Sequence, residues 1–345
     1  MARLPGHRLV EGNSDVTKET VVITCPVCYQ ECELKDGQLG KCRVRQRKGD
    51  SIESLVYGKV VAEHVDPIEK KPIYHVLPGS LSYSIATPGC NFRCLHCQNS
   101  SISQVSVKQN LDLVTTDRLP QQIVAAAKAG GCDSISYTYV EPTVFLEFAY
   151  DCCVGARDEG LKNIFVSNGY MSRRTLVQLA PVLTAMNIDL KSFRDSFYQQ
   201  VCGAKLQPVL ENIRGCVELG VWLEVTTLII PGLNDSDEEL AQIAAFLSAI
   251  NRRIPWHVTA FYPTYKMSDR KMTPPATLER ARRIGHEQGL HHVYTGNIPG
   301  VKGANSVCHF CGEQVISRFG FHLTDNRLVN GNCPGCGNSF PGVWR

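Results

Sequence analysis

The feature that most constrains the fold is a regular alternation of helix-like and strand-like segments between residues 117 and 296. Short segments rich in β-branched and aromatic residues, such as 132–140 and 162–169, alternate with longer segments such as 143–160, which are typical of helices. Strands that are apolar throughout and alternate with helices predict a parallel sheet covered by helices. The chain is therefore predicted to be an α/β protein.

The number of repeats narrows the architecture further. The predicted helices are 117–130, 143–160, 172–180, 208–219, 236–250 and 276–288, and the predicted strands are 132–140, 162–169, 186–190, 221–230, 256–262 and 291–296. These ranges make six helix–strand pairs, and about seven units fit before Gly300, which is too many for a small open sheet and one short of an eight-fold barrel. We therefore favour a curved, partial barrel, in which functional residues collect at the ends of the strands.

Cysteine usage divides the chain into three regions. The 345 residues include 16 cysteines, of which three groups show metal-like spacing. These groups are Cys25, Cys28, Cys32 and Cys42; Cys90, Cys94 and Cys97; and Cys308, Cys311, Cys333 and Cys336. We predict an N-terminal Cys-rich metal-binding lobe over 1–80, a barrel over 81–300 and a C-terminal zinc-ribbon-like domain over 301–345.

Hydropathy and charge exclude several function classes. The chain shows no signal peptide and no run near the ~20 apolar residues of a spanning helix, so we predict a cytoplasmic protein without membrane partners. In a reducing compartment, cysteines indicate metal or redox chemistry rather than disulfides. The balance of 36 Lys and Arg against 33 Asp and Glu neither indicates nucleic acid nor rules it out. The densest basic stretch, 41–50, is interpreted as a solvated turn between strands, with a local basic patch as the alternative.

Five further cysteines have no metal-like spacing. They are Cys132, Cys152, Cys153, Cys202 and Cys216. We interpret them as buried, small apolar residues. Cys202, in the loop-like "VCGAKL", is the one position among them considered for a reactive thiol.

The two outer cysteine groups each supply four ligands. The C-x2-C-G turns at 308–312 and 333–337 predict a closed, tetrahedral and structural zinc site, with a pair of redox dithiols as the alternative. The N-terminal group has the spacing C-x2-C-x3-C-x9-C. Zinc is the first choice there, because a metal would stabilise a small lobe. An iron–sulfur cluster is the alternative, and a third interpretation is that only some of the four cysteines bind a metal.

The central group, in "TPGCNFRCLHCQN" (87–99), has only three cysteines. Three thiolates can hold three irons of a cubane cluster and leave the fourth iron open to a ligand that is not protein. A structural zinc with His96 as fourth ligand is the alternative, but His96 lies directly before Cys97, where reaching the same metal would be strained. The triplet therefore favours a cluster that performs chemistry.

The C-x3-C-x2-C pattern resembles the signature of radical S-adenosylmethionine (SAM) enzymes, with His96 in the usual aromatic position. Residues 54–80, 84–104 and 137–148 together resemble the radical SAM member of the AmmeMemoRadiSam group, which is similar to pyruvate formate-lyase activating enzymes. The resemblance implies a partial (β/α)6-type barrel and a [4Fe-4S] cluster on Cys90, Cys94 and Cys97. It also implies reductive cleavage of SAM to a 5′-deoxyadenosyl radical, which abstracts hydrogen from a substrate that the sequence does not name.

The resemblance also implies which residues contact SAM. Glu141 in "YVEP" resembles the acidic motif that holds the SAM amino group, although Tyr139 and Val140 replace two glycines of that motif. The other implied contacts are Asn168, Asp189 and Lys191 for the ribose and carboxylate, and residues 230–235 and His257 for the pocket wall. "SYSIATPGC" (82–90) would be the first barrel strand, with the triplet in the loop at its end.

Three functions are carried forward. The leading one is a radical SAM enzyme that acts on an unidentified small molecule, peptide or RNA base. The second is an activase that removes hydrogen from a backbone glycine of a partner enzyme. The third is a non-catalytic zinc-binding interaction protein. For the first two, the resemblance implies an electron donor such as flavodoxin or ferredoxin, and Memo-like and AMMECR-like proteins as partners.

Overall fold

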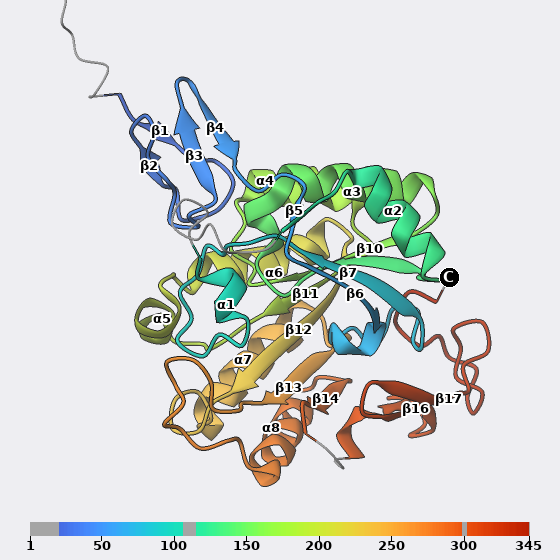
Figure 1. The fold of residues 1–345 in the computed structure, drawn as a ribbon. Helices are drawn as coiled ribbons and strands as arrows, with labels where there is room; N and C mark the ends of the chain where they lie inside the picture. The colour runs from blue at the N-terminus through green and yellow to red at the C-terminus, as the bar shows by residue number, and fades with distance from the viewer. Residues whose placement is uncertain (1–20, 106–114, 299–301, 345) are drawn as a thin grey trace, which may run out of the picture.

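A computed structural model describes residues 21–105, 115–298 and 302–344 of the chain, and the predictions made for the first twenty residues lie outside them. Its centre is an eight-stranded sheet in the order β14-β13-β12-β11-β10-β9-β7-β6 (Figure 1). The strands are β6 (Ala62–Pro67), β7 (Leu81–Ala86), β9 (Ser134–Tyr137), β10 (Lys162–Ser167), β11 (Ala185–Asp189), β12 (Trp222–Ile229), β13 (Trp256–Ala260) and β14 (Val293–Gly296). Neighbouring strands are parallel except for β6 and β7. This α/β sheet is typical of a partial barrel.

Helices connect the parallel strands and lie along the outside of the curved sheet (Figure 1). They are α2 (Pro120–Ala129), α3 (Leu146–Asp158), α4 (Arg173–Leu179), α6 (Gln207–Glu218), α7 (Asp237–Ile250) and α8 (Pro275–Glu287). Local sequence explains their starts: the Ser236 side chain caps α7 by accepting from the Glu239 N–H, and Pro120 begins α2. Ile123, on the predicted apolar face of α2, is buried against the sheet side.

The predicted helices and strands between 117 and 296 agree with the structure to within a few residues at each end. The predicted helix 236–250, for example, is α7, and the predicted strand 162–169 is β10. The sequence did not predict α5 (Asp195–Phe197) or the π-helical turn after it, Tyr198–Cys202. The domain boundaries 1–80, 81–300 and 301–345 stay a prediction.

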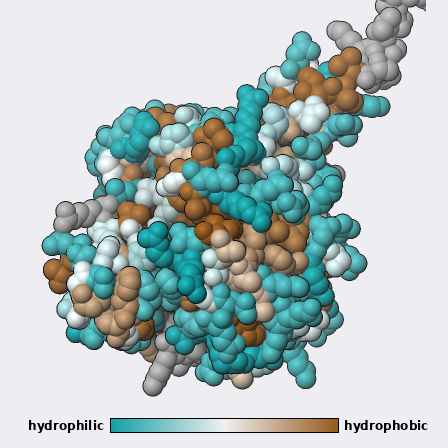
Figure 2. Space-filling model, turned by 180° about the vertical axis from the view of Figure 1, so that it is seen from behind, coloured by the Kyte–Doolittle hydropathy of each residue, from teal (hydrophilic) through white to brown (hydrophobic). Residues whose placement is uncertain are grey.

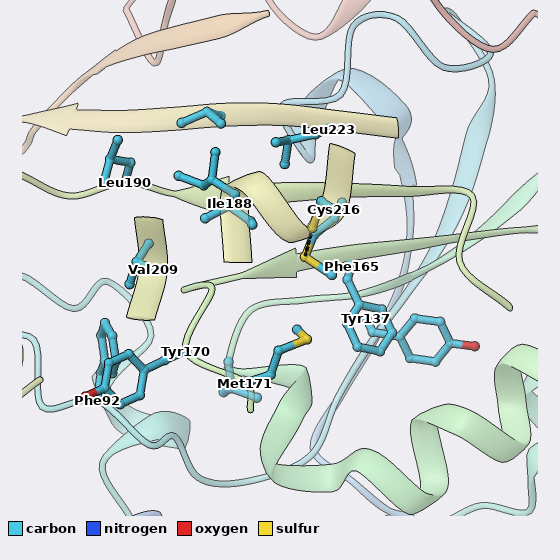
Figure 3. Close-up of a cluster of buried hydrophobic side chains, with 14 of the residues drawn as sticks. Phe92, Tyr137, Phe165, Tyr170, Met171, Ile188, Leu190, Val209, Cys216 and Leu223 are labelled. Carbon is cyan, nitrogen blue, oxygen red and sulfur yellow. Dashed lines mark hydrogen bonds between the residues drawn. The ribbon is translucent and has the colours of Figure 1, made fainter. Parts of the chain in front are cut away.

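The core lies between the sheet and its helices (Figure 3). Phe165 and Ile188 of the strands lie in one buried cluster with Val209 of α6. The Sγ atom of Cys216 is 3.8 Å from the Sδ atom of Met186. The five cysteines without metal-like spacing are all buried, as predicted: Cys132, Cys152, Cys153, Cys202 and Cys216.

The N-terminal lobe projects from the barrel at the upper left of Figure 1. It contains β1 (Ile23–Thr24) paired with β2 (Glu33–Leu34), and β3 (Arg45–Lys48) paired with β4 (Ser51–Ser54). The interpretation of 41–50 as a solvated turn is wrong, because Arg45 and Arg47 are buried, at 4% and 5% exposure. Arg45 pairs with Glu147 of α3, and Arg47 donates to main-chain carbonyls of the lobe. Beyond the lobe, β5 (Lys59–Val60) pairs with β8 (Thr116–Asp117).

The C-terminal unit is a three-stranded antiparallel sheet of β15 (Ser306–Val307), β16 (Gln314–Phe319) and β17 (His322–Asn326). Arg318 attaches it to the barrel. Its guanidinium lies 4.2 Å from the centre of the Tyr74 ring, and it donates to the Tyr74 carbonyl at 2.8 Å and to Ser306 Oγ at 2.9 Å. The unit therefore contacts the barrel through a buried polar network.

None of the helices in the described part of the chain has both the length and the hydropathy to cross a membrane. The face opposite that of Figure 1 is mainly hydrophilic, with hydrophobic side chains gathered near its middle and on the projecting lobe (Figure 2).

Candidate functional site

The three central cysteines lie in the loop that follows β7, at the carboxyl end of the parallel strands. Cys90, Cys94 and Cys97 all line one cavity of about 660 Å³. This volume lies within the range of about 300–1,000 Å³ that small-molecule sites occupy. The triplet is therefore next to a space that can hold a cofactor or a substrate.

The structure brings the predicted SAM contacts to this same cavity. They are Glu141, Asn168, Asp189, Lys191 and His257. Each lies on a strand of the parallel sheet or just beyond its end, because the sheet aligns the carboxyl ends of neighbouring strands at one edge. Residues 230–235 are not among the lining residues. Instead, the side chain of Asn234 hydrogen-bonds to the main chain: its Oδ1 accepts from the Ile230 N–H, and its Nδ2 donates to the Lys191 carbonyl at 2.7 Å.

Glu141 is buried and holds two strand ends together. Its Oε1 accepts from the Thr143 N–H at 3.1 Å and from Ser167 Oγ at 2.9 Å, and its Oε2 accepts from the Asn168 N–H at 2.7 Å. Burial raises its pKa, against the lowering effect of these donors. Because a carboxylate oxygen can accept more than one hydrogen bond, Oε2 keeps capacity for one further donor.

Tyr139 has a backbone conformation that glycine would favour. Its φ of +63° lies in the left-handed region, which costs a non-glycine residue about 1–3 kcal/mol. Asn99 Nδ2 donates to the Tyr139 carbonyl at 2.7 Å, and the Tyr139 hydroxyl donates to Asp66. These bonds hold the strained turn just before Glu141, although the glycines of the family motif are absent.

Asn168 connects the triplet loop to the end of β10. Its Nδ2 donates to Asn91 Oδ1 at 2.7 Å and lies 4.0 Å from Cys90 Sγ, while its Oδ1 accepts from the Tyr170 N–H at 3.0 Å. The side chain is thus already engaged within the protein. Its predicted contact with the SAM ribose stays a prediction.

The cavity is lined by a charged pair and by three residues that each carry an unpartnered polar atom. Lys191 Nζ lies 2.9 Å from an oxygen of Asp189. Three lining residues carry a buried polar atom without a partner in the described part of the chain: Glu69 (Oε2), His96 (Nδ1) and Thr226 (Oγ1). Buried polar atoms are normally hydrogen-bonded, so these atoms mark the cavity as one that fits a polar ligand.

His257 is fixed by a buried carboxylate that the sequence analysis missed. Its Nε2 lies 2.6 Å from Glu224, which also accepts from the Tyr74 and His75 N–H groups at 3.0 and 2.8 Å. Burial would raise the pKa of Glu224, but the hydrogen bond and charge of His257 lower it overall. The only sequence signal was an acidic residue inside the apolar strand "VWLEVTTLII".

Lys71 is a second residue that the sequence analysis missed. It lines the cavity at 1% exposure, and its ammonium pairs with Asp66 and lies 4.9 Å from the centre of the Tyr139 ring. Burial lowers its pKa to about 8, against the raising effect of Asp66. The signal in the sequence was the charged run "DPIEKKP" (66–72), which begins in the last two residues of β6.

The C-terminal cysteines form a different kind of site. The ligand atoms of Cys308, Cys311, Cys333 and Cys336 all lie within 4.8 Å of one another, which suits a single tetrahedral ion. In the rest of the described chain, no other group of three or more Cys, His, Asp or Glu ligand atoms is this close. The alternative of a zinc ion shared by the triplet and His96 therefore gains no support from the geometry.

The chain is similar to several known proteins. Residues 84–247 match the sequence model of the family described as "Radical SAM superfamily". The chain is 43% identical over 309 residues to uncharacterized protein MJ0808 of Methanocaldococcus jannaschii, covering 89% of this chain and 90% of that protein. It is 18% identical over 229 residues to the pyruvate formate-lyase-activating enzyme of Streptococcus mutans, covering 63% of this chain and 87% of that enzyme.

Among solved structures, Streptococcus suis SuiB bound to precursor peptide SuiA aligns with a TM-score of 0.50 at 15% identity. The match covers 67% of this chain and 51% of that chain. At this identity, the likeness concerns the fold alone.

Proposed function

Because the chain belongs to the radical SAM superfamily and is a radical SAM enzyme, we propose that its reaction takes place in the cavity lined by Cys90, Cys94 and Cys97. Membership of the superfamily implies a [4Fe-4S] cluster and SAM. When bound, they supply a one-electron cleavage of SAM that ends in hydrogen abstraction from a substrate. The observation that carries the proposal is that the three thiols and the five side chains predicted to contact SAM line one cavity.

The chain's own residues would bind and orient SAM. Glu141 offers the remaining acceptor capacity of Oε2 to the SAM ammonium group. Lys191 offers a cation to the SAM carboxylate, and Asp189 holds that cation in place. Asn168 holds the triplet loop against the end of β10 through its hydrogen bond to Asn91.

The test is the release of 5′-deoxyadenosine. Anaerobically reconstituted protein, incubated with SAM and dithionite, is expected to release it, and Cys90→Ala is expected to reduce the release to background. Cys216→Ala is the matched control, because this cysteine is buried in the core and away from the cavity. Undiminished release from Cys90→Ala would contradict the site assignment.

The substrate is proposed from the relatives. The similarity to a pyruvate formate-lyase-activating enzyme favours an activase that takes hydrogen from a backbone glycine of a partner enzyme. We expect deuterium to pass from a glycine-deuterated partner into 5′-deoxyadenosine. A lack of transfer from such partners, with transfer from a small molecule or RNA, would favour the other branch. Memo-like and AMMECR-like proteins are the first partners to test, and flavodoxin or ferredoxin is the proposed electron donor.

We also propose that the C-terminal four cysteines hold zinc. Their closeness supports one tetrahedral ion, and a set of four protein thiolates leaves no open position for catalysis. Metal analysis of the purified protein should give one zinc per chain that disappears in Cys333→Ala. A cytoplasmic location stays part of the proposal.

A further inference from the structure

The N-terminal cysteines combine features that separate them from the C-terminal four. Cys25, Cys28, Cys32 and Cys42 line one small enclosed cavity. Yet no three of their sulfur atoms lie within 4.8 Å of one another, unlike those of the C-terminal group. Four thiolates around one zinc ion, each about 2.3 Å from the metal, must lie close together. A wider set suits a ligand that has several metal atoms.

The central triplet provides an internal comparison. Its three thiols, which the superfamily uses for a [4Fe-4S] cluster, likewise do not come within 4.8 Å of one another. The spacing of the N-terminal thiols therefore agrees with the cluster-binding group of the same chain rather than with its single-ion group. An iron–sulfur cluster spreads its thiolates over separate irons, which explains the wider spacing.

Two buried donors line the N-terminal cavity. Asn91 is 1% exposed and Arg45 is 4% exposed. Arg45 Nε has no hydrogen-bond partner in the described part of the chain, so it would otherwise carry the cost of burial without a bond. The Asn91 side chain hydrogen-bonds the Cys28 thiol, so it already points at one of the four sulfur atoms. The sulfides and thiolates of an iron–sulfur cluster are acceptors for both groups. A negatively charged cluster would also be stabilised by the Arg45 guanidinium.

The lobe holds this cavity directly against the triplet loop. Gly89, one residue before Cys90, has a φ of +98°, and a Cβ there would lie 2.5 Å from Val44 Cγ1 of the lobe. Gln30 Nε2 donates to the Asn91 carbonyl at 2.9 Å. Asn91 thus lines the N-terminal cavity and is the next residue after Cys90. The loop that carries the triplet therefore lies directly between the two cysteine groups.

From this arrangement we propose that Cys25, Cys28, Cys32 and Cys42 bind an iron–sulfur cluster through which the electron reaches the cluster of the triplet. The inference rests on the proposed function of the triplet. One electron leaves a low-potential donor of the flavodoxin or ferredoxin class, which is oxidised, and reduces the N-terminal cluster by one electron. That cluster is reoxidised when it passes the electron on, and no bond or proton changes place. The other face of the triplet stays free for SAM and substrate.

The first experiment counts clusters in the full chain. The triple variant Cys90→Ala, Cys94→Ala, Cys97→Ala removes the central ligands, and after anaerobic reconstitution it should keep about half of the wild-type iron and sulfide. On reduction it should show an electron paramagnetic resonance signal of an iron–sulfur cluster. The double variant Cys28→Ala, Cys32→Ala should lose the complementary half. Cys216→Ala is the matched control and should keep all of both.

Zinc in place of iron in the triple variant, with no reduced-cluster signal, would overturn the proposal. Thermal melting and C-terminal zinc content report whether each variant has folded. If a variant fails to fold, Mössbauer spectra of the intact protein still distinguish one cluster from two. Absence of a second cluster with normal SAM cleavage refutes only this inference. A second cluster without SAM cleavage refutes only the proposed function.

The second experiment tests electron entry by spectroscopy rather than by turnover. Reduced flavodoxin is mixed with wild type and with Cys28→Ala, Cys32→Ala, and the signal of the central cluster is followed in time. We expect its reduction to slow at least ~tenfold in the variant, a change of about 1.4 kcal/mol in barrier. Equal rates would show that the electron enters by another route.

Discussion

The triplet loop and the C-terminal unit both present cysteines on turns, yet they differ in what surrounds the sulfur atoms. The C-terminal ligand atoms lie within 4.8 Å of one another on a small sheet with a core of its own, around Val315, Ile316 and Phe340. The triplet lines a cavity of about 660 Å³ that also contains unpartnered polar atoms. Four mutually close thiolates close a site, whereas three beside a polar cavity leave it open. The number and spacing of thiolates therefore separate a stabilising role from a chemical one.

The largest expected effect is the loss of SAM cleavage in Cys94→Ala. A small effect would contradict the chemical role that the comparison assigns to the triplet loop. Cys94→Ala removes one of three cluster ligands, so 5′-deoxyadenosine release should fall to background. The temperature of unfolding should change little by comparison, because the loop is held by other contacts such as the Asn168–Asn91 hydrogen bond. Release is measured by chromatography and unfolding by calorimetry. A variant that cleaves SAM normally would mean that the triplet does not hold the reactive cluster.

The converse is expected for Cys333 in the C-terminal unit. Cys333 is buried in the core of that unit, so Cys333→Ala should lose the metal and destabilise the unit by about 3 kcal/mol or more. SAM cleavage by the remaining barrel should stay within about threefold of wild type, because the four cysteines do not line the cavity. Chelation of the metal should have the same two effects. Loss of SAM cleavage with retained stability would reverse the assigned roles.

Much of the difference between the triplet loop and the C-terminal unit was predictable from the sequence, because the signals for it lie within short stretches of the chain. Cysteine spacing and the alternation of strands with helices are encoded within short stretches, so the triplet loop and the order of elements were predicted. The partner of His257 was not, because Glu224 lies 33 residues away and is joined to Tyr74 across 150 residues. Nor was the burial of Arg45, which depends on Glu147, 102 residues further along. Such contacts between residues distant in the sequence form only when the chain folds.

A pH effect should sharpen the comparison at the joint between the barrel and the C-terminal unit. The His75 ring is buried, with Nδ1 donating to the Pro341 carbonyl at 2.7 Å and Nε2 accepting from the Tyr294 hydroxyl at 2.6 Å. Burial lowers the pKa of His75 to about 4 from 6.5. Between pH 4 and pH 6.5, His75 is therefore mostly protonated in the unfolded chain and mostly neutral in the folded chain. Stability should therefore fall as the pH drops from 6.5 to 4, by the order of 1–3 kcal/mol.

Denaturant unfolding at several pH values measures this effect. His75→Gln should be less stable at neutral pH and should show a flatter pH dependence between 4 and 6.5. Two neighbours also titrate: His292, whose ring centre is 4.7 Å from that of His75, and Glu224. The difference between wild type and variant isolates His75. His64→Gln, on the exposed side of β6, is the control. Identical slopes for all three proteins would exclude His75 as the source.

The smallest effect is expected where the C-terminal unit contacts the cavity itself. Phe321, in the turn between β16 and β17, lines the cavity although it is 43% exposed. Phe321→Ala should therefore cost less than about 1 kcal/mol of stability, since only part of its ring is buried. It should instead open the cavity to water and change the rate of SAM cleavage without substrate by about two- to threefold. Phe319→Ala is the matched control, because Phe319 is 75% exposed and does not line the cavity. If only Phe321→Ala alters the rate of SAM cleavage, the C-terminal unit shields the cavity from water in addition to stabilising the fold. If neither variant alters it, the role of the unit is structural alone.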